Sequence, residues 1–171
     1  MRFAAFTLGL IVSLITFAST LQETLKDLPQ VRFPEAHTVV SGAIDEAHLE
    51  AVKAAGIDHV VNLRPAEENP SFDERSAAEA LGLKYHAIPI KGAQSLTREN
   101  AEALDQILDQ IGDAPVLLHC SSGNRVGALI ALREAWINGK PNEDAIAIGK
   151  RWGLAALEPA VREKLSPSVS P

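Results

Sequence analysis

Cysteine, basic runs and internal repeats are scarce or absent in this chain of 171 residues. Its single cysteine has no partner for a disulfide within the chain, so a fold held together by disulfides is excluded. Acidic residues outnumber basic residues by 22 to 16, and no segment interleaves basic with aromatic side chains. This balance gives no support to nucleic-acid binding, and we expect no nucleic-acid partner.

Long apolar runs are also scarce, and the one candidate lies at the N-terminus. Apolar residues run from Ala4 to Ala18 with four interruptions by small residues, which is short for a helix that spans a membrane. The positive charge of Arg2, the apolar core and the small residue Ala18 predict a secretory signal at residues 1–18. The alternative is a retained N-terminal anchor. In either case we expect an exported protein, periplasmic or secreted, with no stable membrane partner beyond this segment.

Residues 19–166 have the length of a single domain that can bury a core, and residues 167–171 are expected to form a disordered tail. Apolar segments alternate with segments of helical spacing along this domain. Strands are expected at 38–41, 57–63, 83–90 and 116–118, and helices at 45–55, 71–81, 97–111, 126–137, 142–152 and 159–165. This alternation predicts an α/β fold of three layers, in which a mostly parallel sheet is flanked by helices on both faces.

Local signals mark the beginnings of several helices. Asp45 and Thr97 are good N-cap residues. Ser71 and Glu74 have the spacing of a capping box, which places the beginning of that helix at Ser71. Residues 19–37 carry little signal beyond a short helix followed by an irregular stretch.

The strongest functional signal lies in the stretch 115–129. An apolar strand leads to His119 and Cys120, a small polar loop follows, and Arg125 opens a helix. Such a unit aims backbone N–H groups and the positive end of the helix dipole at one point, which makes an anion site. A cysteine at the rim of that site is expected to be a nucleophilic thiolate. The alternative is that the cysteine is a small buried apolar residue.

In sheets of parallel strands, ligands bind at the carboxyl ends of the strands. The loop after Cys120 and the loop after Arg64 both lie at such ends. We therefore expect them on the same side of the sheet.

Four separate segments carry a resemblance to a known family: residues 40–44 (VSGAI), 61–65 (VNLRP), 85–90 (YHAIPI) and the motif HCxxGxR at 119–125. Together they resemble the beta-lactamase-hydrolase-like, phosphatase-like domain family, which is similar to the dual-specificity branch of the protein tyrosine phosphatases. The resemblance covers nearly all of residues 36–140. It implies a cysteine-phosphatase-like fold that hydrolyses a small anionic phosphoester, with no metal and no organic cofactor.

The resemblance also implies a role for each residue around the cysteine. Cys120 corresponds to the nucleophile, and Arg125 to the arginine whose fork of donors holds the oxygens of the anion. His119 corresponds to a residue that orients the loop through a hydrogen bond, and Arg64 lies in a supporting position. The anion-binding loop between the nucleophile and the arginine consists of Ser121, Ser122, Gly123 and Asn124.

Three departures from the phosphatase pattern keep other reactions open. Four residues separate Cys120 from Arg125, where cysteine phosphatases of this kind have five. Val126 replaces a hydroxyl residue. No carboxylate appears between Ile90 and Glu99, where the general acid is expected; such an acid is worth about 10²–10⁴ in rate. The short loop is similar to that of rhodanese-type sulfurtransferases, which carry a persulfide on cysteine. A third interpretation is a domain that binds an anion or a peptide without turnover.

Other polar groups carry weaker signals. The acidic residues between 67 and 74 are explained by helix capping, with Glu67 or Glu68 as a minority candidate for the missing acid. The remaining histidines lack the spacing of metal ligands, so no metal site is predicted. They are His37, His48, His59 and His86.

Overall fold

The computed structural model describes residues 21–166. The predicted signal at 1–18 and the predicted tail at 167–171 lie outside the described residues. Within 21–166, no helix is both long and apolar enough to cross a membrane.

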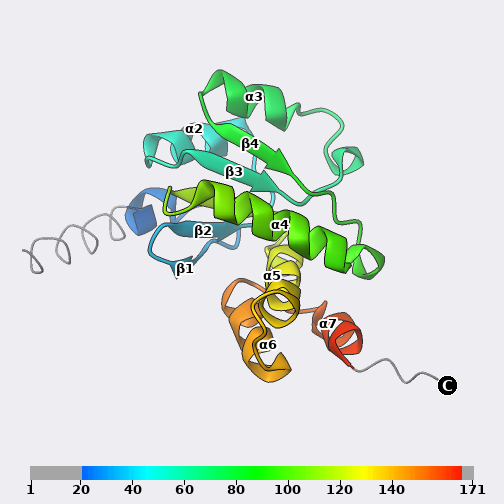
Figure 1. The fold of residues 1–171 in the computed structure, drawn as a ribbon. Helices are drawn as coiled ribbons and strands as arrows, with labels where there is room; N and C mark the ends of the chain where they lie inside the picture. The colour runs from blue at the N-terminus through cyan, green and yellow to red at the C-terminus, as the bar shows by residue number, and fades with distance from the viewer. Residues whose placement is uncertain (1–20, 167–171) are drawn as a thin grey trace, which may run out of the picture.

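A five-stranded sheet forms the middle layer of the fold, with the strand order β1-β2-β5-β3-β4 (Figure 1). Strands β2, β5, β3 and β4 run parallel, whereas β1 pairs antiparallel with β2 at one edge. The predicted α/β fold with a mostly parallel sheet is therefore confirmed. The strands are β1 (Arg32–Glu35), β2 (Thr38–Ser41), β3 (His59–Asn62), β4 (Lys84–Ala87) and β5 (Val116–His119).

Helices cover both faces of this sheet, as predicted. Neighbouring residues of a strand point to opposite faces, so Val60 and Val61 belong to two different cores. The core around Val60 is closed by the helical turn at 21–25 and by α2 (Glu46–Ala54) and α3 (Glu74–Ala80). The core around Val61 is closed by α4 (Arg98–Ile111), α5 (Asn124–Trp136), α6 (Asn142–Arg151) and α7 (Glu158–Leu165).

Two parts of the expected secondary structure were wrong. The stretch expected to be irregular contains β1, a short edge strand whose register shifts between Arg32 and Glu35; its proline, Pro34, is tolerated because it lies on an edge strand. The helix expected from Ser71 begins at Glu74 instead, because Asp73 is its N-cap and accepts hydrogen bonds from Ser76 N and Oγ at 3.1 and 2.7 Å. The expected N-caps Asp45 and Thr97 are confirmed.

The register of the sheet determines which loops meet. Ser41, His119 and Asn62 are paired side by side on β2, β5 and β3. The residues that follow them leave the sheet at the same edge, and a single bridge between Gly42 and Ser122 continues the contact beyond it. Three loops therefore converge where β5 ends.

Candidate functional site

The cysteine loop begins where β5 ends and finishes where α5 begins. Cys120 is 1% exposed, and its Sγ accepts a hydrogen bond from Gly123 N at 3.1 Å. Gly123 has φ +81, and a Cβ atom there would lie 3.0 Å from Nη1 of Arg32. The positive φ favours glycine at this position.

The beginning of α5 faces this loop. Its N-cap, Gly123, offers no side chain to the helix, so the first N–H groups of the helix have no acceptor within it and carry the positive end of its dipole. The side chain of Asn124 accepts hydrogen bonds from Ala155 N and Leu157 N at 2.8 and 3.3 Å. The Asn124 side chain therefore binds the segment after α6. Within this part of the loop, the groups that remain to bind an anion are the backbone N–H groups.

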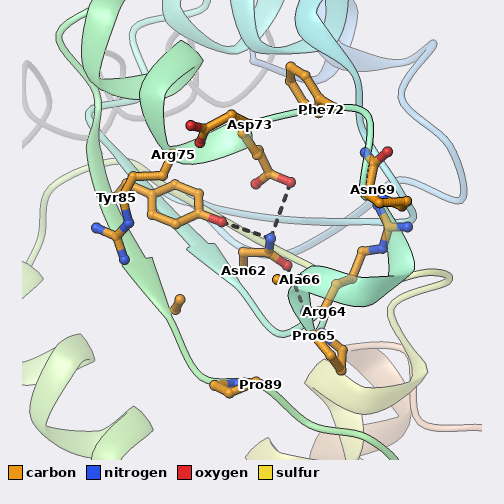
Figure 2. Close-up of a pocket in the computed structure, with 13 residues that line it drawn as sticks. Asn62, Arg64, Pro65, Ala66, Asn69, Phe72, Asp73, Arg75, Tyr85 and Pro89 are labelled. Atoms are coloured by element: carbon orange, nitrogen blue, oxygen red, sulfur yellow. Dashed lines mark hydrogen bonds between the residues drawn. The ribbon is translucent and has the colours of Figure 1, made fainter.

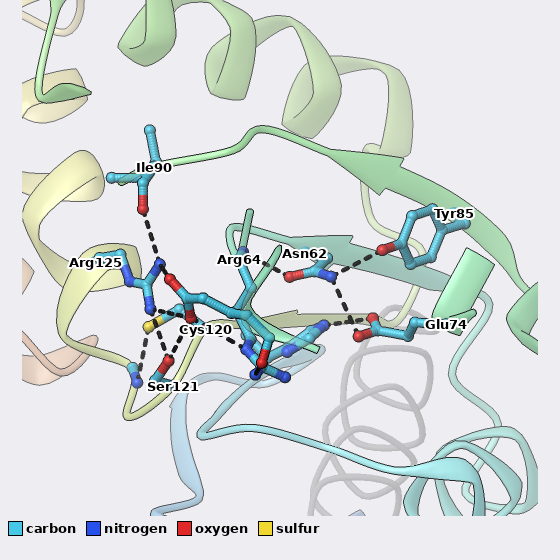
Figure 3. A network of polar contacts seen from close by, with 11 residues as sticks. Asn62, Arg64, Glu74, Tyr85, Ile90, Cys120, Ser121 and Arg125 are labelled. Atoms are coloured by element: carbon cyan, nitrogen blue, oxygen red, sulfur yellow. Dashed lines mark hydrogen bonds and ion pairs between the residues drawn. The ribbon is translucent and has the colours of Figure 1, made fainter. Parts of the chain in front are cut away.

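Arg125 points from the first turn of α5 into the site (Figure 3). Its Nη1 donates to Glu68 Oε1 at 2.7 Å and to the carbonyl of Ile90 at 2.8 Å. Its Nη2 donates to Glu68 Oε2 at 2.8 Å and to Ser121 Oγ at 2.6 Å. The hydrogen bond to Glu68 and the charge of Cys120 raise the pKa of Arg125.

Glu68 is the carboxylate at the centre of this group. Besides Arg125, its Oε2 accepts from Ser121 Oγ at 2.9 Å and from Arg64 Nε at 3.4 Å, and its backbone carbonyl accepts from Arg64 Nη2 at 2.8 Å. The hydrogen bond from Arg125 is the largest cause that lowers the pKa of Glu68 to about 2. In this arrangement Glu68 is ionised and has no proton to give to a leaving group.

A second polar network lies behind the cysteine loop. His119 is fully buried, and its Nε2 lies 2.7 Å from Oε1 of Glu74, which is itself 6% exposed. Asn62 Nδ2 donates to Glu74 Oε2 at 3.1 Å and to Tyr85 Oη at 2.8 Å, and Asn62 Oδ1 accepts from Arg64 N at 2.7 Å. His119, the residue before Cys120, is thus connected through Glu74 and Asn62 to the loop that carries Arg64 and Glu68.

A cavity of about 520 Å³ opens beside this second network (Figure 2). Its wall includes Asn62, Arg64, Phe72, Tyr85 and Pro89. Burial raises the pKa of Tyr85 to about 12, with a further contribution from the charge of Glu74. The Tyr85 hydroxyl therefore stays protonated at ordinary pH.

The structure brings Ser121, Arg125 and Arg64 together around the carboxylate of Glu68. Cys120 lies close to Arg125. Ser122 lies at the back of the loop, where its carbonyl accepts from Arg32 Nη1 at 3.4 Å. Within residues 21–166, no group of three or more histidine, cysteine, aspartate or glutamate side chains could hold a metal ion.

Sequence reasoning missed several of these residues. It treated Glu74 as a capping residue and gave no role to Asn62 or Tyr85. It weighed Glu68 as an acid but not as the partner of Arg125. The one sequence signal for this network is Asn62 itself, a polar residue that closes an otherwise apolar strand end, VVN.

A cysteine that accepts a hydrogen bond from a backbone N–H group, an arginine in the first turn of the next helix and a mostly parallel sheet together place this protein in the class of α/β proteins with a cysteine-phosphatase-like fold. The particular family follows from comparison of the sequence. This chain belongs to the family described as "Beta-lactamase hydrolase-like protein, phosphatase-like domain", whose model matches residues 30–137.

Known relatives agree with this assignment. The "Beta-lactamase hydrolase-like protein" of Agrobacterium fabrum (strain C58 / ATCC 33970) is 32% identical over 128 residues, which cover 72% of this chain and 29% of the relative. The chain thus spans less than a third of the length of the curated relatives that it matches. The crystal structure of a "Putative phosphatase (DUF442)" from Shewanella putrefaciens CN-32 has a TM-score of 0.68 at 27% identity, covering 84% of this chain and 93% of that one. Tk-PTP in its active form shares the fold, with a TM-score of 0.58 at 22% identity over 80% of this chain and 96% of that one.

Proposed function

We propose that this domain is a cysteine-dependent phosphatase that hydrolyses a phosphoester. The observation that carries the proposal is that Arg125 and Ser121 already bind an oxyanion, the Glu68 carboxylate, next to Cys120. A phosphoryl group offers oxygens to the same fork. The family and the phosphatase-like neighbours support the same class of reaction.

The reaction proceeds in two displacements. The Cys120 thiolate attacks phosphorus, a P–S bond forms, the P–O bond to the leaving group breaks, and the leaving oxygen takes a proton from water. Water then attacks the cysteinyl phosphate, the P–S bond breaks, phosphate is released, and the proton of the attacking water passes to solvent. Arg125 and the first N–H groups of α5 stabilise the charge on the phosphoryl oxygens in both steps.

The leaving group tests this proposal. Because Glu68 is ionised and the loop after Ile90 reads Lys91-Gly92-Ala93-Gln94, no acid assists departure. Aryl phosphates with good leaving groups should turn over slowly, alkyl phosphates hardly at all, and the rate should fall steeply as the pKa of the leaving group rises. Cys120→Ser should abolish turnover. Turnover at the wild-type rate in that variant would contradict the proposal.

Sulfur transfer is the second candidate, and the four-residue spacing between Cys120 and Arg125 favours it. The Cys120 thiolate would attack the outer sulfur of thiosulfate, the S–S bond would break, and sulfite would leave with the electron pair. The persulfide would then pass its outer sulfur to cyanide or to a thiol and regenerate the thiolate. This reaction needs no acid for an oxygen leaving group. Incubation with thiosulfate, followed by mass spectrometry of Cys120, tests it.

Export is proposed separately, on the apolar segment that precedes the domain. Cleavage after Ala18 gives a mature chain that begins at Ser19. The mass of the N-terminal peptide of the natural protein tests this, and an intact Met1 in the cytoplasmic fraction would contradict it.

A further inference from the structure

Glu68 fills the position in which the loop holds an oxyanion. Its Oε1 and Oε2 each accept from a different Nη atom of Arg125, and Oε2 also accepts from Ser121 Oγ (Figure 3). This is the two-oxygen, fork-to-fork geometry in which arginine binds carboxylates and phosphates.

The four Nη hydrogens of Arg125 are all used in this arrangement. The two Nη atoms carry four hydrogens, and the structure gives them four acceptors: Glu68 Oε1, Glu68 Oε2, Ile90 O and Ser121 Oγ. An incoming oxyanion therefore obtains the arginine fork only if Glu68 leaves it. Cys120 is 1% exposed in the same arrangement.

Glu68 can leave without unfolding its surroundings. It ends a short 3-10 turn, η1 (Ala66–Glu68), between β3 and α3, and its side chain is 30% exposed. The backbone of the turn stays tied to the domain through the bond from Arg64 Nη2 to the Glu68 carbonyl. Rotation of one side chain into solvent is therefore sufficient to free the fork.

We propose that Glu68 is an internal competitor for the anion position, and that it sets the minimum affinity that a substrate must have. The inference rests on the proposed function, because it names the substrate class of the same site. A tethered carboxylate acts at a high effective concentration, so only a small fraction of the molecules have the open site, in which Glu68 has left Arg125. The apparent affinity of every ligand is reduced by that same fraction.

The common factor leaves relative affinities unchanged, so which ligands displace Glu68 depends on how strongly each one binds the open site. A carboxylate ligand brings the same two oxygens and single charge as Glu68 and gains nothing by the exchange. A tetrahedral dianion brings a second charge and a third oxygen, which can reach the unsatisfied N–H groups at the beginning of α5. The site should therefore bind dianionic tetrahedral groups, such as the phosphoryl group of a phosphomonoester. It should not bind singly charged planar anions measurably at ordinary concentrations.

The test compares binding of sulfate, a tetrahedral dianion, with binding of acetate by titration calorimetry. The proteins are the wild-type chain and its Glu68→Gln and Glu67→Gln variants. Glu67 is the matched control, because it lies on the same turn but pairs with Lys91 at 2.7 Å outside the loop. Glu68→Gln should bind sulfate at least about tenfold more tightly and should bind acetate more tightly by the same factor. Glu67→Gln should change both affinities by less than about twofold, because exposed charges are screened.

Two results would overturn the proposal. One is unchanged sulfate affinity in Glu68→Gln. The other is an increase in sulfate affinity that is about the square of the increase in acetate affinity. That result would mean that Glu68 acts by electrostatic repulsion, because repulsion scales with the charge of the ligand whereas displacement affects both ligands by the same factor. Glu68→Asp, which keeps the charge but shortens its reach, should fall between wild type and Glu68→Gln, and it supplies the comparison if the glutamine variant folds poorly. Since the readout is binding, the absence of phosphoester turnover would leave this result unaffected.

Discussion

At the scale of single residues, the site depends on buried side chains that hydrogen-bond one another, although Nδ1 of His119 has no partner among them. Asn62 uses both hydrogens of its amide nitrogen and its oxygen, on Glu74, Tyr85 and Arg64. Glu74 in turn accepts from Asn62 and His119 with separate oxygens. Buried polar groups destabilise the fold when they are left unpaired. Removal of one member should therefore lower stability by leaving its partners without a hydrogen bond.

The buried pair of Glu74 and His119 gives a stability prediction. Glu74→Ala leaves His119 Nε2 and Asn62 Nδ2 facing a cavity, and loss of one partner of a buried pair costs about 3–5 kcal/mol. We expect the free energy of unfolding in urea to fall by about 3 kcal/mol. Glu79→Ala on the same helix is the control, since Glu79 pairs with Arg75 where both are more than half exposed, and we expect a change below about 0.5 kcal/mol there. Equal, small effects of both variants would contradict the structural role of Glu74.

Hydrogen bonds between residues a few positions apart could be predicted from the sequence. Those between residues far apart in the sequence could not. Asp45 and Thr97 cap helices through bonds to residues three positions on, and such spacing is visible in a sequence. Glu68 meets Arg125 across 57 residues, and Glu74 meets His119 across 45. Glu74 also fits a capping box with Ser71, and nothing local shows that Asp73 takes the cap and leaves Glu74 free to turn inward.

At the scale of elements, α5 carries the site and depends on a close crossing with α6. A Cβ atom on Gly127 would collide with Leu154 N and with the backbone of Gly149 and Gly153. A Cβ atom on Gly153 would in turn lie 2.9 Å from the carbonyl of Gly123 in the cysteine loop. The glycines at this crossing therefore connect the packing of the helices to the position of the loop.

Gly127→Ala tests this connection. The new methyl group meets backbone atoms, which cannot move aside cheaply, and overpacking of this kind costs about 1–3 kcal/mol or more. We expect a loss of about 3 kcal/mol in urea unfolding, together with weaker sulfate binding at the loop. Gly82→Ala is the control: its methyl meets nothing within 4 Å, and its φ of +72 costs about 1–2 kcal/mol. A Gly127→Ala protein with normal sulfate affinity would show that the crossing does not position the loop.

The order of elements was predictable because hydrophobic alternation and helix ends are local properties, and it placed the loops after Arg64 and Cys120 at one edge. The strand β1 could not be predicted from the sequence, because its four residues, RFPE, include a proline and carry no alternating pattern. Its contribution to the site, the contact of Arg32 with the back of the cysteine loop, was invisible for the same reason.

At the scale of the whole molecule, two cores share one sheet, and the site lies where the parallel strands end. His59, the first residue of β3, stacks on His86 of β4, with ring centroids 5.5 Å apart and Nδ1 of His59 lying 3.2 Å from Nε2 of His86. Burial lowers the pKa of both rings, and nearby positive charges add to the effect.

This pair predicts how stability depends on pH. Both rings have lower pKa values in the folded chain than the ordinary value of about 6.5, so the unfolded chain binds more protons below that pH. Their contribution is therefore complete above about pH 6.5 and is lost as the pH falls through the folded pKa values. Urea unfolding of the wild-type chain should show stability that declines from pH 7 to pH 5. The double variant His59→Gln, His86→Gln should show a flatter decline over this range, and an identical slope would contradict the assignment.

The proposed function requires that Cys120 forms a covalent bond to the phosphorus of its substrate. The direct measurement is mass spectrometry of the chain after acid quenching during turnover of an aryl phosphate, with peptide mapping to locate the adduct. We expect one phosphoryl group on Cys120, absent from Cys120→Ser. Turnover with Cys120 unmodified, or with the phosphoryl group on another residue, would contradict it. A single added sulfur on Cys120 from thiosulfate, without any phosphoryl adduct, would assign the site to sulfur transfer instead.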